Sequence, residues 1–128
     1  MDKKLIIVGA ILGMIAIVLG AFGAHALKNV LTVEQLNTFE TGVKYQMYHA
    51  LFLMFVANSQ MITQKIKKTI LILVSLGVLF FSGSIYLLAT NNLTTFDFKI
   101  IGFITPIGGL LLITGWIFVI VNFFNKKS

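Results

Sequence analysis

Four runs of apolar residues, each about as long as a bilayer is thick, constrain this chain more than any other feature. They cover about residues 5–24, 45–62, 69–89 and 100–124, and a helix needs roughly 20 residues to cross the hydrocarbon. None of the runs alternates between apolar and polar residues as a membrane strand would. The sequence therefore predicts an all-α membrane protein, a bundle of four transmembrane helices that forms one integral membrane domain over residues 1–128.

The composition leads to the same class of protein. The chain is 58% hydrophobic and 11% charged, with a mean hydropathy of +0.97, which is beyond the range of soluble domains. Its net charge of +6 does not indicate nucleic acid, because the lysines sit in short clusters and no basic face interleaved with exposed aromatics is present. The chain has no cysteine, which excludes thiolate metal sites and thiol nucleophiles. The partners implied are the lipid bilayer and either a second copy of the chain or another membrane protein.

The lysines are distributed unevenly between the two sides of the membrane. An even number of spans puts both chain ends on one side, together with the loop between the second and third runs. That side carries seven lysines and the opposite side three: Lys3, Lys4, Lys65, Lys67, Lys68, Lys126 and Lys127 against Lys28, Lys44 and Lys99. The positive-inside rule then predicts that both termini are cytoplasmic.

Five small residues of the first run fall on one face of the expected helix. Gly9, Gly13, Ala16, Gly20 and Gly23 are separated by 4, 3, 4 and 3 positions, which makes them a single helical stripe. Small side chains let a neighbouring helix approach closely where lipid supplies no hydrophobic drive between helices. The stripe favours a packed helix over the alternative of a cleaved signal peptide. Further packing positions are expected at Gly42, Gly83, Pro106, Gly108 and Gly109, and the proline, which lacks an amide hydrogen, predicts a kink or a close packing point.

The stretch Thr32-Val33-Glu34-Gln35 has the form of a capping box, which predicts that a helix begins there. A helix over residues 33–62 would measure about 45 Å, longer than the hydrocarbon is thick. We therefore expect a short outer amphipathic helical extension before a membrane part at 45–62, with a bend at Gly42.

Polar residues are costly inside a membrane and therefore carry the strongest functional signal in this sequence. Counted from the outer ends of the runs, nine of them fall in the outer half of the membrane and form a candidate polar cluster: His25, Tyr45, Gln46, Tyr48, His49, Ser82, Ser84, Tyr86 and Thr105. The inner half is nearly bare. The sequence therefore predicts a polar layer shared by all four helices near the outer surface.

Three roles are open to the two histidines of this cluster: hydrogen bonds that lock the first helix to the second, a proton or ligand site, and contact with lipid headgroups. We favour the first. No metal is expected, because two histidines without an embedded carboxylate lack the usual supporting acid. No catalytic residue is expected, since Ser82 and Ser84 lie within a membrane helix and no acid in any run could orient a base. Trp116 is interpreted as an ordinary apolar residue.

Four motifs follow one another along the chain. They are Gly20-Ala-Phe-Gly-Ala-His25-Ala-Leu27, Phe39-x-x-Gly42-x-x-Tyr45-Gln46-x-Tyr48-His49-Ala-Leu51, Phe81-Ser-Gly-Ser-x-Tyr86-Leu-Leu88, and Ile104-Thr-Pro-Ile-Gly-Gly109 with Gly115-Trp116. Together they closely resemble the YgdD/YwdK-like family, a domain-of-unknown-function family of small, mostly bacterial inner-membrane proteins. The resemblance covers nearly the whole chain and implies four helices in a bacterial plasma membrane. It brings no established reaction, substrate or cofactor.

Two functions are compatible with these observations. We favour a non-enzymatic membrane protein with a structural or accessory role in the cell membrane. The alternative is a small transporter or channel component that uses the polar cluster as a binding site. Chain length favours the first, because 128 residues are too few for the paired halves that frame a transport site unless copies assemble. No cofactor is expected in either case.

Overall fold

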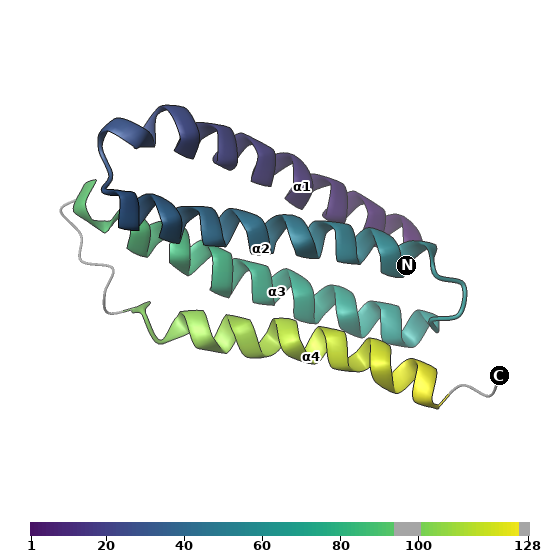
Figure 1. Cartoon of the computed structure of the whole chain (residues 1–128). Coiled ribbons are helices and arrows are strands. Elements are labelled where there is room, and N and C mark those ends of the chain that lie inside the picture. The colour runs from purple at the N-terminus through teal and green to yellow at the C-terminus, as the bar shows by residue number, and fades with distance from the viewer. Residues whose placement is uncertain (94–100, 126–128) are drawn as a thin grey trace.

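The computed structural model describes residues 1–93 and 101–125, which fold into four long antiparallel helices (Figure 1). They are α1 (Asp2–His25), α2 (Val33–Asn58), α3 (Gln64–Ala89) and α4 (Ile104–Phe124), with the short 3-10 helices η1 (Leu27–Asn29) and η2 (Asn91–Leu93) after α1 and α3. These two described ranges contain no β-strand. The predicted all-α class and the four helices are confirmed.

Three of the described helices are long and apolar enough to cross a membrane: α1 with η1, α3 and α4. The helix α2 is as long but more polar, since it carries Glu40, Lys44, Gln46 and His49. It nevertheless runs beside α1 and α3 along their length (Figure 1). Its polar residues, rather than its position, therefore separate it from the other three.

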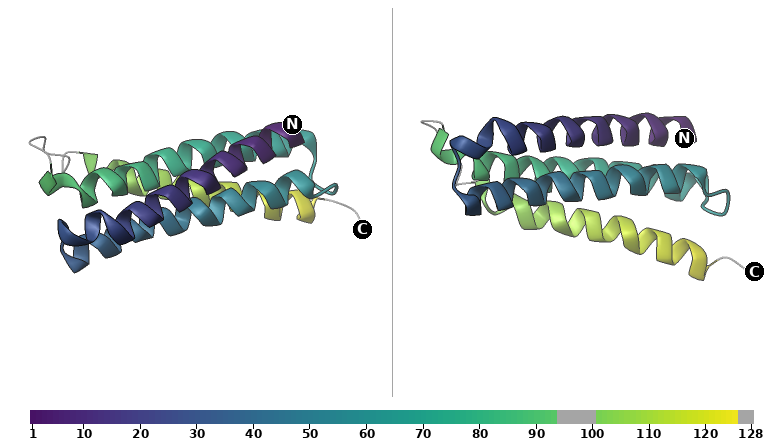
Figure 2. Two further views of the ribbon diagram at one scale, coloured as in Figure 1. Left: turned by 90° about the horizontal axis from the view of Figure 1, so that it is seen from above. Right: turned by 45° about the horizontal axis from the view of Figure 1, so that its top comes forward.

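The helices α2 and α3 form a central pair, with α1 on one side and α4 on the other (Figures 1 and 2). Seen from above in Figure 2, α1 crosses this pair obliquely, so that its start lies near the beginning of α3 and its end lies near the beginning of α2. At its start, the Lys67 ammonium donates to Asp2 Oδ1 at 2.8 Å. At its end, Gly23 packs against the Phe39 ring. We call these two ends of the bundle the Lys67 end and the His25 end.

Apolar side chains fill the bundle in two clusters. The larger one lies toward the Lys67 end and contains Leu5, Phe52, Leu53, Val56, Ala57, Ile62, Ile70, Val74, Val78 and Leu112. The smaller one closes the His25 end and contains Leu27, Leu31, Phe39 and Ala89. Polar side chains that join the helices lie between the two clusters, and a second group of them lies at the Lys67 end.

The small-residue stripe of α1 packs against α2. All four glycines of the stripe face atoms of α2. Ala16, the fifth residue of the stripe, is 1% exposed. The approach is closest at Gly9, where an added Cβ would lie 2.9 Å from the Ala50 carbonyl oxygen. Since real Cβ atoms essentially never come that near, the missing side chain is what allows the two backbones to meet.

The same contacts fix which parts of α1 and α2 share a depth. Gly9 lies beside Ala50, and Gly23 lies beside Phe39. Because the two helices are antiparallel, the apolar run of α1 lies beside about residues 39–58 of α2. The membrane-level part of α2 therefore begins and ends earlier along the chain than the predicted 45–62.

The turn between α2 and α3 also comes earlier than predicted. The helix α2 ends at Asn58 rather than at residue 62, because Ser59 has extended backbone with φ −85° and ψ 108°. The helix α3 begins at Gln64 rather than at residue 69, because the Thr63 hydroxyl accepts from the Ile66 amide and caps it. The helix α2 therefore has 26 residues and is about 39 Å long, shorter than the predicted length of about 45 Å.

The start of α2 matches the predicted capping box. The Thr32 hydroxyl accepts from the Gln35 amide at 3.1 Å, and Gln35 Oε1 accepts from the Thr32 amide at 2.9 Å. Beyond this start, α2 is one continuous helix through Gly42, so the predicted bend is wrong. The missing side chain of Gly42 instead admits α3, because an added Cβ would lie 2.7 Å from Tyr86 Cε1.

Of the kink or close packing point expected around Pro106, the structure contains the close packing point. The helix α4 begins at Ile104, four residues later than predicted, so Pro106 falls in its first turn. Amides in a first turn have no partner inside the helix, and a proline is tolerated there. The close packing point lies two residues further on at Gly108, where an added Cβ would overlap the Phe81 amide nitrogen and lie 2.8 Å from the Phe80 carbonyl carbon.

Candidate functional site

Gln46 joins three helices from its place in α2. Its amide Nε2 donates to the Leu12 carbonyl of α1 at 2.8 Å, and its Oε1 accepts from the Tyr86 hydroxyl of α3 at 2.7 Å. The side chain is 3% exposed. Both ends of the amide are thus used for helix-to-helix bonds, and Gln46 is the centre of the polar layer that the structure contains.

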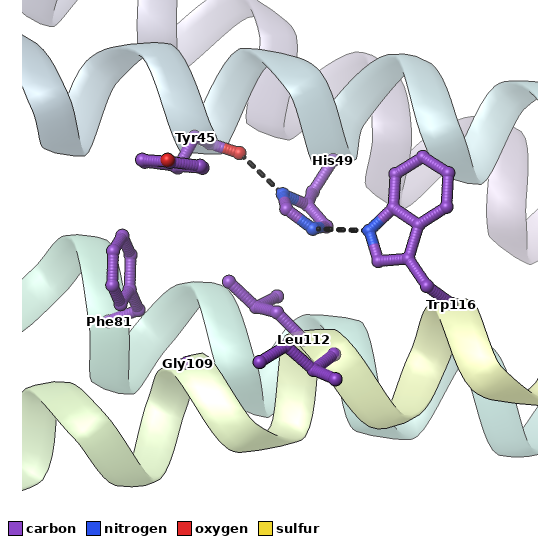
Figure 3. A pocket seen from close by; sticks show the side chains of 7 residues that line it. Tyr45, His49, Phe81, Gly109, Leu112 and Trp116 are labelled. Atoms are coloured by element: carbon purple, nitrogen blue, oxygen red, sulfur yellow. Dashed lines mark hydrogen bonds between the residues drawn. The ribbon is translucent and has the colours of Figure 1, made fainter.

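His49 lies one turn after Gln46 and connects α2 with α4 (Figure 3). Its Nδ1 lies 2.7 Å from the Tyr45 carbonyl oxygen, and its Nε2 lies 3.1 Å from the Trp116 indole Nε1. A carbonyl can only accept and an indole N–H can only donate. The proton of the His49 ring is therefore assigned to Nδ1, and Nε2 is the acceptor. The ring is then neutral, and both of its nitrogens are hydrogen-bonded.

Trp116 is the partner that the sequence interpretation missed. Besides its bond to His49, its ring stacks on Phe52 with centroids 4.1 Å apart. It is the only tryptophan of the chain, and an indole N–H in apolar surroundings usually needs an acceptor, although the Trp116 residue itself is 47% exposed. That requirement was the one signal in the sequence that could have linked it to a histidine.

Two serines of α3 bind α3 to its neighbours. The Ser82 hydroxyl donates to the Gly42 carbonyl of α2 at 2.7 Å. Ser84 donates to the Phe81 carbonyl of its own helix at 3.0 Å and is hydrogen-bonded to the Thr105 hydroxyl of α4. Since one hydroxyl has one proton, Thr105 is the donor in the Ser84–Thr105 bond.

Three residues of the predicted cluster are not part of this layer. His25 is exposed at the end of α1 and makes no hydrogen bond to any other residue that the structure describes. Tyr45 and Tyr48 are 41% and 53% exposed, and their rings pack edge to face with centroids 5.6 Å apart. The bond between α1 and α2 that was expected of the histidines is made by Gln46 instead.

The layer reaches the middle of the bundle. Leu12, the α1 partner of Gln46, is near the middle of α1, about 20 Å from its His25 end at 1.5 Å per residue. The layer therefore extends from the first turn of α4, at Thr105, to the middle of the bundle. Whether the cluster occupies the outer half of the membrane stays a prediction; within the bundle, Gln46 lies beside the middle of α1 rather than near its end.

A second polar group, at the Lys67 end, was not foreseen as a site. Lys67 is 1% exposed, and its ammonium bonds both Asp2 Oδ1 and the Ala57 carbonyl oxygen. Asn122 of α4 is 4% exposed; it accepts from the Thr63 amide and donates to the Met61 carbonyl. Lys67 was counted among the lysines that set the topology, yet it is an internal contact that ties the α2–α3 turn to the start of α1.

Two of the grooves between the helices border the polar layer. One, of about 280 Å³, lies between α2, α3 and α4 and is lined by Tyr45, His49, Phe81, Gly109, Leu112, Ile113 and Trp116 (Figure 3). The other, of about 440 Å³, lies between α1 and α3 with Gln46 at its base and Gly83 on its wall. An added Cβ at Gly83 would meet nothing nearer than Leu79 at 4.0 Å. Gly83 therefore borders a groove rather than a close helix contact, in contrast to the role expected for it.

The polar atoms of this region are satisfied within the protein. Across the described residues, no buried side-chain nitrogen or oxygen lacks a hydrogen-bond partner. The same residues contain no group of three or more His, Asp or Glu that could hold a metal ion. The polar side chains of this region therefore use their hydrogen bonds to join the helices to one another.

The chain is similar to proteins that are known only as membrane proteins. Residues 19–109 match the family described as protein of unknown function DUF423. A UPF0382 membrane protein of Staphylococcus saprophyticus is 41% identical over 96% of this chain and 98% of its own length. YwdK of Bacillus subtilis is 40% identical over 93% and 94% of the two chains. The UPF0382 inner membrane protein YgdD of Escherichia coli is 32% identical over 98% and 93%.

No solved structure matches the chain. The relatives cover nearly its full length, and the two whose names appear in the resemblance, YwdK and YgdD, are among them. The resemblance drawn from the motifs is confirmed: this chain is a membrane protein and belongs to the DUF423 family of proteins of unknown function.

Proposed function

We propose that this chain is a non-enzymatic integral membrane protein with a structural or accessory role in the bacterial plasma membrane. The observation that supports this role is the use of the polar layer. Gln46, His49, Ser82 and Ser84 each bond another helix, and none keeps a buried polar atom free for a substrate. A transport or catalytic site would need such groups directed into a cavity.

Substituting the histidines by glutamine tests this proposal. In a deletion strain complemented at native expression level, His49→Gln is expected to restore resistance to detergent and exclusion of a charged dye as the wild type does. Glutamine has a donor and an acceptor for the Tyr45 carbonyl and the Trp116 indole but cannot titrate. The matched control is His25→Gln, which changes an exposed ring and should also be neutral.

The readouts are dye entry, growth in detergent and the amount of protein in the membrane. Loss of the wild-type phenotype by His49→Gln at normal membrane abundance would contradict the proposal, because it would assign a proton or a ligand to this ring. The same loss in His25→Gln would contradict it at the other histidine.

We also propose that both termini lie in the cytoplasm, as the lysine distribution predicts. Since the chain lacks cysteine, single cysteines report one position each. A membrane-impermeant maleimide applied to intact cells is expected to label Asn29→Cys, at the His25 end, and to leave Gln60→Cys and Ser128→Cys unlabelled until the cells are permeabilised. Labelling of the last two in intact cells, with Asn29→Cys protected, would reverse the orientation.

A further inference from the structure

One side of α2 points away from the other three helices. We call this the α2 outward face; it consists of Asn37, Glu40, Thr41, Lys44, Tyr48, Leu51 and Phe55. Tyr48, Leu51 and Phe55 are 53%, 58% and 57% exposed, and Glu40 and Lys44 are also exposed. Its first half is therefore polar and charged, and its second half is apolar.

The outward faces of the neighbouring helices are different. On α1 the most exposed side chains along the middle of the helix are Met14, Ile17 and Val18, and on α4 they include Leu110 and Ile113. Aliphatic side chains of this kind suit contact with lipid tails. Apart from the first turn of α1, which carries Asp2, Lys3 and Lys4, the α2 outward face is the one outward surface of the described helices that combines an acid with a base.

These charges lie beside the last two turns of the apolar run of α1. Gly23 of α1 lies beside Phe39, and Gly20 lies beside Val43. Glu40 is therefore level with the last turn of the apolar run of α1, and Lys44 lies one turn further inside. Charged side chains within a membrane span are expensive and normally pair or face other protein.

Neither charge has a side-chain partner in the part of the chain that the structure describes. The ion pair found among residues 1–93 and 101–125 is Lys67–Asp2. Within the same ranges the side chains of Glu40 and Lys44 make no ion pair or hydrogen bond. An acid and a base thus lie one helical turn apart on one exposed face, and the described residues form no ion pair with either of them.

We propose that the α2 outward face is the interface between two copies of this chain, in which Glu40 of each copy pairs with Lys44 of the other. Two copies in one membrane share an orientation, so a two-fold axis along the membrane normal sets their α2 helices side by side and parallel. A two-fold interface must be complementary to itself. A face with one acid and one base a turn apart meets this condition, because the two-fold axis forms two identical ion pairs.

The rest of the face fits the same partner. Below the charges, Leu51 and Phe55 supply apolar contact, and Tyr48 is supported from behind by the Tyr45 ring. Pairing would remove both charges from lipid and satisfy them together. This inference goes beyond the proposed function, since it assigns a partner and a surface rather than a role in the membrane.

Disulfide crosslinking in native membranes tests the interface. Single cysteines are placed on the α2 outward face at Thr41→Cys, between the two charges, and at Leu51→Cys, in the apolar half. Ile17→Cys on α1 and Ile113→Cys on α4, which are 66% and 57% exposed in the native protein, serve as matched controls. Copper–phenanthroline oxidation is expected to give dimers on non-reducing gels from the two α2 positions and at least fivefold less from the controls. No dimer from either α2 position, or equal dimer from all four, would overturn the proposal.

Charge exchange then tests the ion pairs. In the Leu51→Cys chain, Glu40→Lys and Lys44→Glu alone each place like charges across the two-fold axis and are expected to lower dimer yield at least threefold. The double exchange Glu40→Lys with Lys44→Glu restores opposite charges and should restore the yield. Membrane abundance of each variant controls for folding. An unchanged dimer yield in all three variants would contradict the pairing and would indicate that the charges contact lipid headgroups instead. A double variant whose dimer yield is no higher than that of either single variant would lead to the same conclusion.

Discussion

Replacing Gly108 by alanine is expected to destabilise the protein by about 3 kcal/mol, the upper part of the range for overpacking a tight contact. The added methyl group would overlap the Phe81 amide nitrogen and lie 2.8 Å from the Phe80 carbonyl carbon. Both are backbone atoms of α3 and cannot rotate away as a side chain could. The helices α3 and α4 would have to separate, with loss of the neighbouring Ser84–Thr105 bond.

The measurement is reversible unfolding in mixed micelles titrated with dodecyl sulfate and followed by far-ultraviolet circular dichroism. The matched control is Gly83→Ala, also within a helix, where the nearest atom to an added Cβ is 4.0 Å away. Because alanine is the better helix former by roughly 1 kcal/mol, this control should be neutral or slightly stabilising. Equal stability of the two variants would show that α3 and α4 do not approach at Gly108 as described.

The second large effect is expected at Gln46. Gln46→Leu keeps the volume of the side chain but removes its bonds to Leu12 and Tyr86. The Tyr86 hydroxyl then loses its acceptor in a half-buried position, and a buried unsatisfied group costs about 1–3 kcal/mol. Since measured bonds between membrane helices often contribute less than this, we expect a loss of about 2 kcal/mol in the free energy of unfolding.

A double-mutant cycle with Tyr86→Phe isolates the bond between the two side chains. Tyr86→Phe alone should cost about 1 kcal/mol, because it leaves Gln46 Oε1 without a donor. The double variant has neither orphaned group, so its loss should be smaller than the sum of the two single losses. Strictly additive losses, measured in the same titration, would mean that Gln46 and Tyr86 do not interact.

The elements of this fold could be predicted because they depend on local properties. Bilayer-length apolar runs identified α1, α3 and α4, and the motif beginning at Thr32 located the start of α2 through a capping box that the structure contains. The small-residue stripe of α1 indicated a close helix contact, which is made with α2. The errors in the elements were also local: Thr63 caps α3 early, and Pro106 lies in a first turn instead of a helix interior.

The polar site could be predicted only as a set of residue types. Six of its nine members contribute to the layer, because polar side chains inside apolar runs must find partners. Which partner each one has was not predictable: His49 bonds Trp116, 67 residues away, and Lys67 bonds Asp2, 65 residues away. Such pairs depend on the relative shift of neighbouring antiparallel helices along their axes. The properties of single residues do not determine that shift.

The sequence by itself determined the number of helices, their membrane location and the family, because each follows from apolar length, charge and short motifs. Only the tertiary structure decided which residues share a depth. The close contacts at Gly9 and Gly108 contribute to the register of α1 on α2 and of α4 on α3, and the register placed Gln46 at the middle of the bundle and left His25 outside the layer. A helix register is the sum of many weak contacts along two surfaces, so it exists only once both surfaces are in place.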